Sequence, residues 1–179
     1  MTTMRNLLFA LCLLPLASYG QKSAIGWQTF SIGAPALQIL LPGEPLPQNA
    51  NLPEAVQSYI KKYEAFYYQD GKGLVVTLMH VVDSVDVMSD VKGAIDGTNG
   101  QWERTGSKVA VLSTTNNKIN GKNAIQQRGK LINGGQENDY MDIVIGEGAK
   151  LWQVIVMVPS KDTVLQTTMQ KIIDSISIK

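Results

Sequence analysis

The chain has 179 residues and a formal net charge of +1, and 44% of its residues are hydrophobic. This balance excludes the basic stripe of a nucleic-acid-binding protein and the polybasic patch of a protein that binds anionic lipids. A single histidine and a single cysteine supply too few nitrogen and sulfur ligands for a zinc site.

The N-terminus has the features of a cleavable signal peptide. Arg5 supplies a positive charge, and residues 7–16 form an apolar run. Small side chains at Ser18 and Gly20 fit the minus-three and minus-one positions before Gln21. Because a bilayer-spanning helix needs about 20 apolar residues, this shorter run favours cleavage between Gly20 and Gln21 over a membrane anchor.

Cleavage at that point removes Cys12 and with it every thiol of the chain. The bulky Leu11 before Cys12 argues against a lipoprotein signal, in which a small residue is expected there. We therefore predict a signal peptide over residues 1–20 and one exported domain over residues 21–179, periplasmic or secreted. A domain of about 160 residues can bury enough surface to fold without disulfides.

Alternating apolar residues between glycine turns predict a largely antiparallel, meandering sheet. Asp70-Gly71 and Asn120-Gly121 favour hairpins because these dipeptides tolerate the positive φ angles of tight turns. The segment 74–82 is apolar on both faces, which is typical of a central strand. The strands are expected over residues 27–32, 37–41, 56–69, 74–83, 109–119, 123–132, 139–145 and 151–158.

Apolar residues at helical spacing predict a C-terminal helix, with Ser160 or Asp162 as N-cap. Its apolar stripe consists of Leu165, Met169, Ile172, Ile173 and Ile176.

A second helix is expected to begin near Asp86 as N-cap. It places Val87, Val91 and Ile95 on one side, together with Trp102. Glycine costs about 1 kcal/mol within a helix, so we expect the helix to stop near Gly97 or to kink before Trp102.

The order of these motifs resembles the PsbP-like fold. The likeness spans nearly the whole mature chain and is carried by Phe30-x-Ile32, Ile39-Leu40-Leu41-Pro42-Gly43-x-Pro45, Ile119-Asn120-Gly121-Lys122-Asn123-Ala124, Trp152 and Ile173-Asp174-Ser175-Ile176. The resemblance implies an α+β domain arranged as an α/β/α sandwich, from a family whose better known members bind partners rather than turn over substrates. No functional residue of the family can be matched onto this sequence.

The motifs that could bind a cofactor do not have the required context. Gly146-Glu147-Gly148 leads into another strand, whereas a dinucleotide fingerprint opens a helix. The acidic groups Asp83, Asp86 and Asp90, and Glu137, Asp139 and Asp142, lack the spacing of a calcium loop. We therefore expect no cofactor and no metal.

His80, the only histidine, is the one candidate for acid–base catalysis. It lies within an apolar strand, and no nucleophile-elbow sequence accompanies it. We interpret it as a core histidine, with a hydrolase that uses His80 as the alternative.

Tyr59, Tyr63 and Tyr67 are spaced to share one face of their strand. Tyrosines in a row suit a partner or glycan surface, because they bury area and keep a polar tip. The alternative is that they pack beneath a helix or beneath the connection over residues 43–53, since Ala65 interleaves them.

The preferred hypothesis is an exported, non-catalytic binding or assembly module. Its expected partner is another envelope or secreted protein, with no nucleic acid and no membrane span after cleavage. The alternatives are the hydrolase and a carrier of a small apolar ligand.

The signal-peptide hypothesis predicts the N-terminus of the exported protein. Intact mass spectrometry should show a chain that begins at Gln21, because signal peptidase cuts after small residues such as Gly20. Retention of residues 1–20, or a lipid on Cys12, would contradict the prediction.

Overall fold

The computed structural model describes residues 26–49, 57–84 and 90–179. In chain order the elements are β1 (Gln28–Ile32), β2 (Leu37–Leu41), β3 (Leu46–Pro47), β4 (Ile60–Gln69), β5 (Val75–Asp83), α2 (Val91–Arg104), β6 (Lys108–Ile119), β7 (Lys122–Asn133), β8 (Gln136–Glu147), β9 (Lys150–Pro159), α3 (Thr163–Asp174) and β10 (Ser177–Ile178). Neither helix of the described ranges is long and apolar enough to cross a bilayer.

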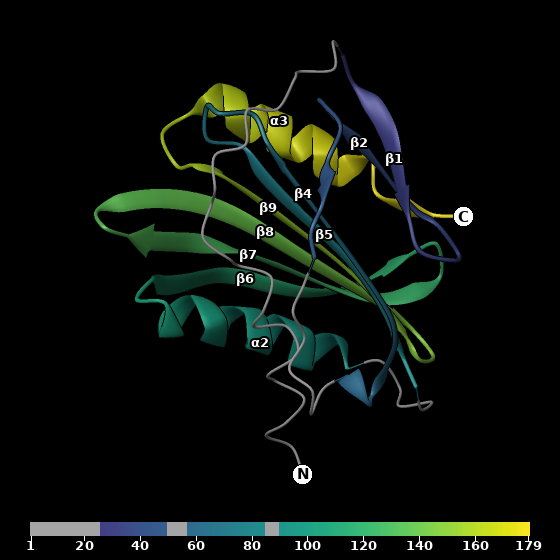
Figure 1. Ribbon diagram of the computed structural model, residues 1–179. Coiled ribbons are helices and arrows are strands. Elements are labelled where there is room, and N and C mark those ends of the chain that lie inside the picture. Colours follow the sequence, from purple (N-terminus) through teal and green to yellow (C-terminus); the bar gives the residue numbers. More distant parts are fainter. Residues whose placement is uncertain (1–25, 50–56, 85–89) are drawn as a thin grey trace.

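A seven-stranded antiparallel sheet separates the two helices (Figure 1). Its strand order is β3-β4-β5-β9-β8-β7-β6. Helix α2 covers one face, and α3 covers the other together with a three-stranded sheet of order β1-β2-β10. The predicted α+β class with a largely antiparallel sheet is confirmed.

The sheet is not a simple meander. Strands β6 to β9 follow one another as hairpins, but β9 then pairs with β5 in the middle of the sheet. Helix α2 therefore carries the chain from the central strand β5 to the far edge at β6. The central place of β5 agrees with its sequence, since residues of both faces are buried: Val76 and Leu78 toward α3, and Met79 toward α2.

The predicted turns join the expected strands. Asn120-Gly121 has positive φ at both residues, whereas at Asp70-Gly71 only Gly71 does and the connection spans residues 70–74. Asn120 and Gly121 adopt φ angles of 49° and 80° between β6 and β7, which is the left-handed pair that a two-residue hairpin needs. At the β4–β5 turn, Asp70 Oδ1 accepts hydrogen bonds from the amides of Lys72, Gly73 and Leu74.

Helix α3 follows the prediction closely. Asp162, rather than Ser160, is the N-cap, and its Oδ1 accepts a hydrogen bond of 2.9 Å from the Leu165 amide. Ile176 lies beyond the helix end but still packs against the same core.

Helix α2 differs from the prediction at both ends. Its N-cap is Asp90, whereas Asp86 and Val87 lie outside the described residues. The helix continues through Gly97 to Arg104. Burial of the large Trp102 side chain outweighs a glycine cost of about 1 kcal/mol, so the helix neither ends nor is interrupted at Gly97.

Strand β4 is shorter than predicted. It begins at Ile60, and residues 58 and 59 form a turn. Tyr59 therefore precedes the strand. The register also shifts between Ile60 and Lys62, so alternation from Tyr59 does not carry through to the later residues.

Substitution of Ile172 tests the core under α3. Ile172 is 0% exposed, and Ile→Ala in a core typically costs about 2–5 kcal/mol. We expect a urea midpoint well below that of the wild type. Val164→Ala on the same helix is the control, because Val164 is 73% exposed and should change stability by about 0.5 kcal/mol or less. An unchanged midpoint for Ile172→Ala would exclude this packing.

Candidate functional site

His80 lies inside the molecule, on the face of β5 that is turned toward the three-stranded sheet. Its side chain is 1% exposed. Nδ1 lies 3.0 Å from Glu64 Oε2 on the neighbouring strand β4. The imidazole stacks on Trp152 of β9 with 5.1 Å between ring centroids. The structure thus joins three central strands through one histidine.

Burial sets the charge of this group. It lowers the pKa of His80, and the hydrogen bond and charge of Glu64 only partly oppose this. Burial alone would raise the pKa of Glu64, but hydrogen bonds from Lys62 and His80 outweigh it and lower that pKa. A neutral imidazole beside an ionised Glu64 carries its hydrogen on Nδ1, and this N–H donates a hydrogen bond to the carboxylate.

The turn over residues 33–36 closes the histidine off. A Cβ on Gly33 would lie 2.5 Å from Trp152 Nε1 and 2.8 Å from His80 Cδ2. Gly33 also has a φ of 82°, so the close approach and the backbone both require glycine.

His80 Nε2, the nitrogen that would activate a nucleophile, is buried and has no hydrogen-bond partner among the described residues. A serine–histidine pair needs a hydroxyl within hydrogen-bond reach of this nitrogen. The Glu64–His80 pair therefore has the base and its orienting carboxylate, but it has neither the hydroxyl nor an open path to solvent.

A second buried titratable group lies on the opposite face of the sheet, beneath α2. Asp142 of β8 is 0% exposed, and its Oδ1 and Oδ2 accept from the single Nε2 of Gln153 at 2.9 and 2.8 Å. The same Nε2 lies 2.9 Å from Thr98 Oγ1 of α2. Burial raises the pKa of Asp142 to about 7, against the lowering effect of the Gln153 hydrogen bond.

Protonation would improve this pair. Gln153 Oε1 is buried without a partner among the described residues. A protonated Asp142 can donate to Oε1 and accept from Nε2, which gives the two-bond pairing of an acid with an amide. The ionised form leaves Oε1 unsatisfied and buries a charge.

Among the described residues, the acidic side chains noted in the sequence are not gathered into a cluster of metal ligands. No cluster of three metal-ligating side chains occurs in the described ranges. Asp139 and Asp142 lie an odd number of residues apart on β8, so they point to opposite faces of the sheet. In the other group, Asp90 caps α2 and Asp86 lies outside the described residues.

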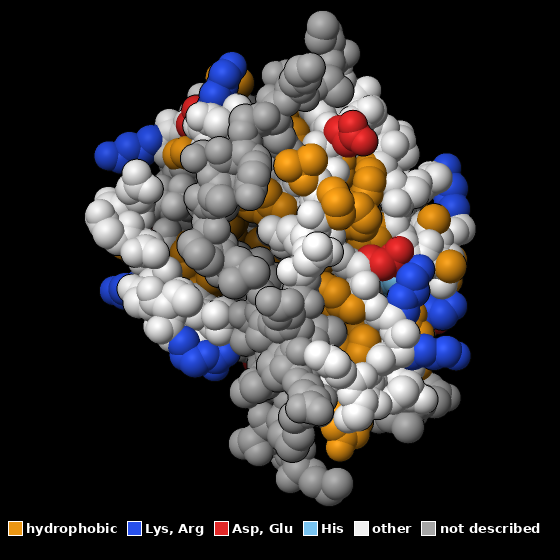
Figure 2. All heavy atoms as spheres, in the orientation of Figure 1, with side chains coloured by type: hydrophobic (Ala, Val, Ile, Leu, Met, Phe, Trp, Pro, Cys, Tyr) orange, Lys and Arg blue, Asp and Glu red, His pale blue; other side chains and the backbone are white. Residues whose placement is uncertain are grey.

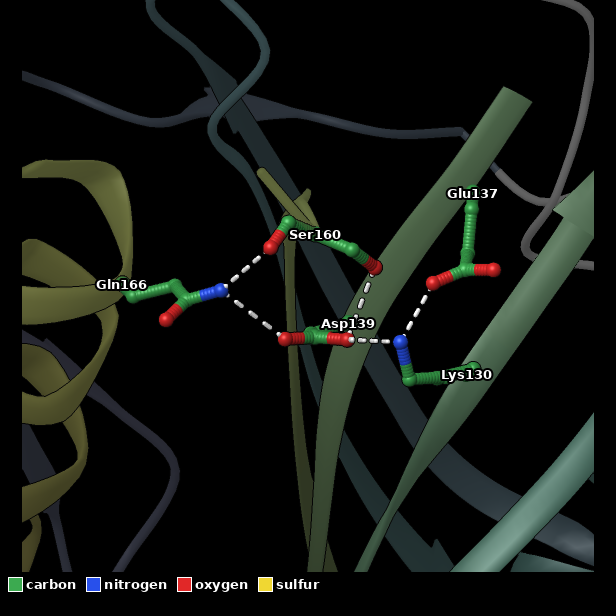
Figure 3. A network of polar contacts seen from close by, with 5 residues as sticks. All are labelled: Lys130, Glu137, Asp139, Ser160 and Gln166. Carbon is green, nitrogen blue, oxygen red and sulfur yellow. Dashed lines mark hydrogen bonds and ion pairs between the residues drawn. The ribbon is translucent and has the colours of Figure 1, made fainter. Parts of the chain in front are cut away.

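Asp139 instead ties α3 to the end of the sheet (Figure 3). Its Oδ1 accepts from Ser160 Oγ at 2.8 Å and its Oδ2 from Gln166 Nε2 at 3.0 Å, and Gln166 also donates to the Ser160 carbonyl. Lys130 lies 3.7 Å from Asp139 and pairs with Glu137. Both oxygens of the Asp139 carboxylate have partners in this network, so we assign it to packing.

The predicted tyrosine surface is divided by the structure. Tyr63 and Tyr67 lie on one face of β4, where Tyr63 packs against the cluster of Trp102 and Ala65. Burial raises the pKa of Tyr67 to about 12. Tyr59, 54% exposed, stands outside the strand. Hydrophobic side chains show on the face over β2 to β5 (Figure 2), and a partner surface at these tyrosines stays a prediction.

The predicted cleavage residues Gly20 and Gln21 lie outside the described residues. Sequence reasoning recognised His80 but not Glu64 as its partner. The Asp70-Gly71 turn predicts that β4 pairs with β5, but it does not predict the register that places Glu64 opposite His80. The burial of Asp142 could have been predicted, because this acid lies within the apolar run Tyr140-Met141-Asp142-Ile143.

Two solved structures share this arrangement. The solution structure of cyanobacterial PsbP (CyanoP) from Synechocystis matches with a TM-score of 0.59 and 9% identity, over 93% of this chain and 100% of that chain. The crystal structure of LpqN, involved in cell envelope biogenesis of Mycobacterium tuberculosis, matches with a TM-score of 0.51 and 15% identity, over 86% and 91%. No family model and no curated protein matches the sequence. The two structural matches confirm the PsbP-like fold.

The buried Asp142 predicts a stability that falls as the pH rises. Its pKa is raised from 3.8 to about 7 in the folded chain, so its favourable contribution is complete below about pH 4 and is lost as the pH rises through 7. Asp142→Asn should remove this loss, because the amide can pair with both Gln153 groups without a charge.

Urea unfolding at pH 5 and pH 8 measures the effect. From pH 5 to pH 8 the free energy of unfolding should fall by at least about 1 kcal/mol more in the wild type than in Asp142→Asn, since one pKa unit corresponds to about 1.4 kcal/mol. The control Asp96→Asn, on the exposed side of α2, should show no such difference. Equal pH dependence in wild type and Asp142→Asn would contradict the prediction.

Proposed function

We propose that the chain is an exported, non-catalytic binding or assembly module of the cell envelope, and that its partner is another envelope or secreted protein. The enclosure of His80 carries this proposal. The only histidine is held between Glu64 and Trp152 under the Gly33 turn, and its Nε2 has no partner among the described residues.

The comparisons support the compartment. LpqN is described as involved in cell envelope biogenesis, and the N-terminus of this chain reads as a signal peptide. An exported module of this fold would act where such a protein acts. Both structural neighbours have low sequence identity, so the support rests on shared architecture and on the chain's own N-terminus.

The two alternatives have less support. A hydrolase based on His80 would need the turn over residues 33–36 to lift and a hydroxyl to reach Nε2. A carrier of an apolar ligand would need space between the layers, but Val76, Val154 and Val156 on the α3 side are 0–1% exposed.

Assays of the purified protein against ester, phosphate, peptide and glycoside substrates test the non-catalytic proposal. We expect no rate above buffer, because no nucleophile or open base is assembled at His80. His80→Ala should lower stability, since it leaves a space beside Trp152 and removes the partner of Glu64.

Two further variants identify the origin of any rate that is seen. A rate that survives Lys72→Ala but is lost in both His80→Ala and Glu64→Gln would overturn the proposal in favour of the hydrolase. Lys72 is exposed at the β4–β5 turn, so its loss should leave any rate unchanged. A rate that survives all three changes does not come from His80.

A further inference from the structure

The two edges of the seven-stranded sheet are built differently. At one edge, β3 has two residues, one of which is Pro47. Short strands and proline are common means of preventing edge-to-edge association. At the other edge, β6 runs for twelve residues without a proline. Of the two outermost strands of the described sheet, β6 alone is long enough to receive another strand.

The hydrogen-bonding groups of β6 that point outward can be identified. The register shifts between Val111 and Ser113 and is regular from Ser113 to Ile119. The two-residue turn closes Ile119 and Lys122 as a hydrogen-bonded pair, and bonded and non-bonded pairs alternate along an antiparallel ladder. The backbones of Thr114, Asn116 and Lys118 therefore point away from β7.

The side chains around this edge leave it open. Residues 111–118 are all exposed, and Val111 and Leu112 at the bulge are 49% and 58% exposed. Between Val111 and Asn117 the strand has no charged residue. The Lys118 amide is bonded to the Asn117 side chain, so Thr114 and Asn116 offer the amides for a further strand.

Charge indicates which strand would bind. Strands β6 and β7 contain five basic residues and no acidic one: Lys108, Lys118, Lys122, Arg128 and Lys130. Lys122 and Lys130 are neutralised by Glu147 and Glu137. The other three have no ion pair in the part of the chain that the structure describes.

We propose that β6 is the docking edge of this chain and that it binds an extended, acidic segment of a partner protein, added to the sheet as a strand beside residues 113–119. This rests on the binding function proposed above. Main-chain hydrogen bonds would supply the affinity. Lys118 on one face of the sheet and Arg128 on the other would select acidic side chains on both faces of the added strand. A second copy of the chain fits less well, because pairing two β6 strands brings together two sets of unpaired cations.

A labelled peptide tests this surface. The probe is a capped, fluorescein-labelled heptapeptide in which pairs of adjacent glutamates are separated by threonines, so that both faces of the added strand carry carboxylates. Its binding to the purified protein is followed by fluorescence anisotropy. Lys118→Glu and Arg128→Glu should each weaken binding by about tenfold. The control Lys72→Glu makes the same charge change at the distant β4–β5 turn and should alter binding by about twofold or less.

The backbone part of the proposal has its own variants. Asn116→Pro removes one outward amide without touching the ladder to β7, and it should abolish binding while circular dichroism stays unchanged. If that variant unfolds, the wild-type protein with a peptide N-methylated at every second residue replaces it, tested in both alternating registers. Loss of binding in one register supports the proposal.

Several results would overturn it. These are equal binding of a peptide with lysine in place of glutamate, full binding by Asn116→Pro or by both N-methylated peptides, no binding of the acidic probe, and dimerisation of the protein through β6.

Photo-crosslinking in the native envelope separates this proposal from the broader one. A photoreactive residue replaces Thr115 on β6 or, as control, Lys72. A partner joined from position 115 through an acidic segment supports both proposals. A partner joined only from position 72 overturns docking at β6 and leaves the binding function standing. No partner from either position counts against both.

Discussion

Strands β5, β8 and β9 are covered on both faces, by α2 on one side and by α3 with the small sheet on the other. Successive residues of each strand therefore alternate between the two cores. In the middle of these strands a polar side chain is shielded from water, so pairing with another polar group in its layer stabilises it. The His80–Glu64 pair and the Asp142–Gln153 pair both arise from this constraint, on opposite faces of the same sheet.

Local sequence rules account for most elements, because the strands alternate and the turns contain residues that accept positive φ. These rules fail where a contact with a distant part of the chain determines the structure. Trp102 holds α2 together beyond Gly97 by packing on Tyr140, with ring centroids 4.8 Å apart, and no local propensity reports a ring on another strand. The pairing of β9 with β5 likewise depends on which two strands bury both faces, a choice made by the whole sheet.

The candidate site was less predictable than the fold. A histidine in an apolar strand indicates burial, but its partner depends on strand register, which a one-residue slip would change. The acidic groups show the same limit, since proximity in sequence suggested a cluster that the pleat of β8 divides between two faces. The two titratable pairs lie inside the molecule, whereas the open hydrogen-bonding groups of β6 lie at an edge of the sheet.

Strand β10, close to the C-terminal end of the chain, pairs with the early strand β2. Ile178 pairs with Leu37 in β2, and the backbones of Ala36 and Lys179 exchange hydrogen bonds of 2.9 Å. During synthesis the small sheet cannot be completed until β10 has emerged. Until then the apolar face of β5 and β9 lacks part of its cover, so the native structure is complete only after β10 has joined β2. A truncation that removes Ile178 should therefore act on the first strands as strongly as on the last.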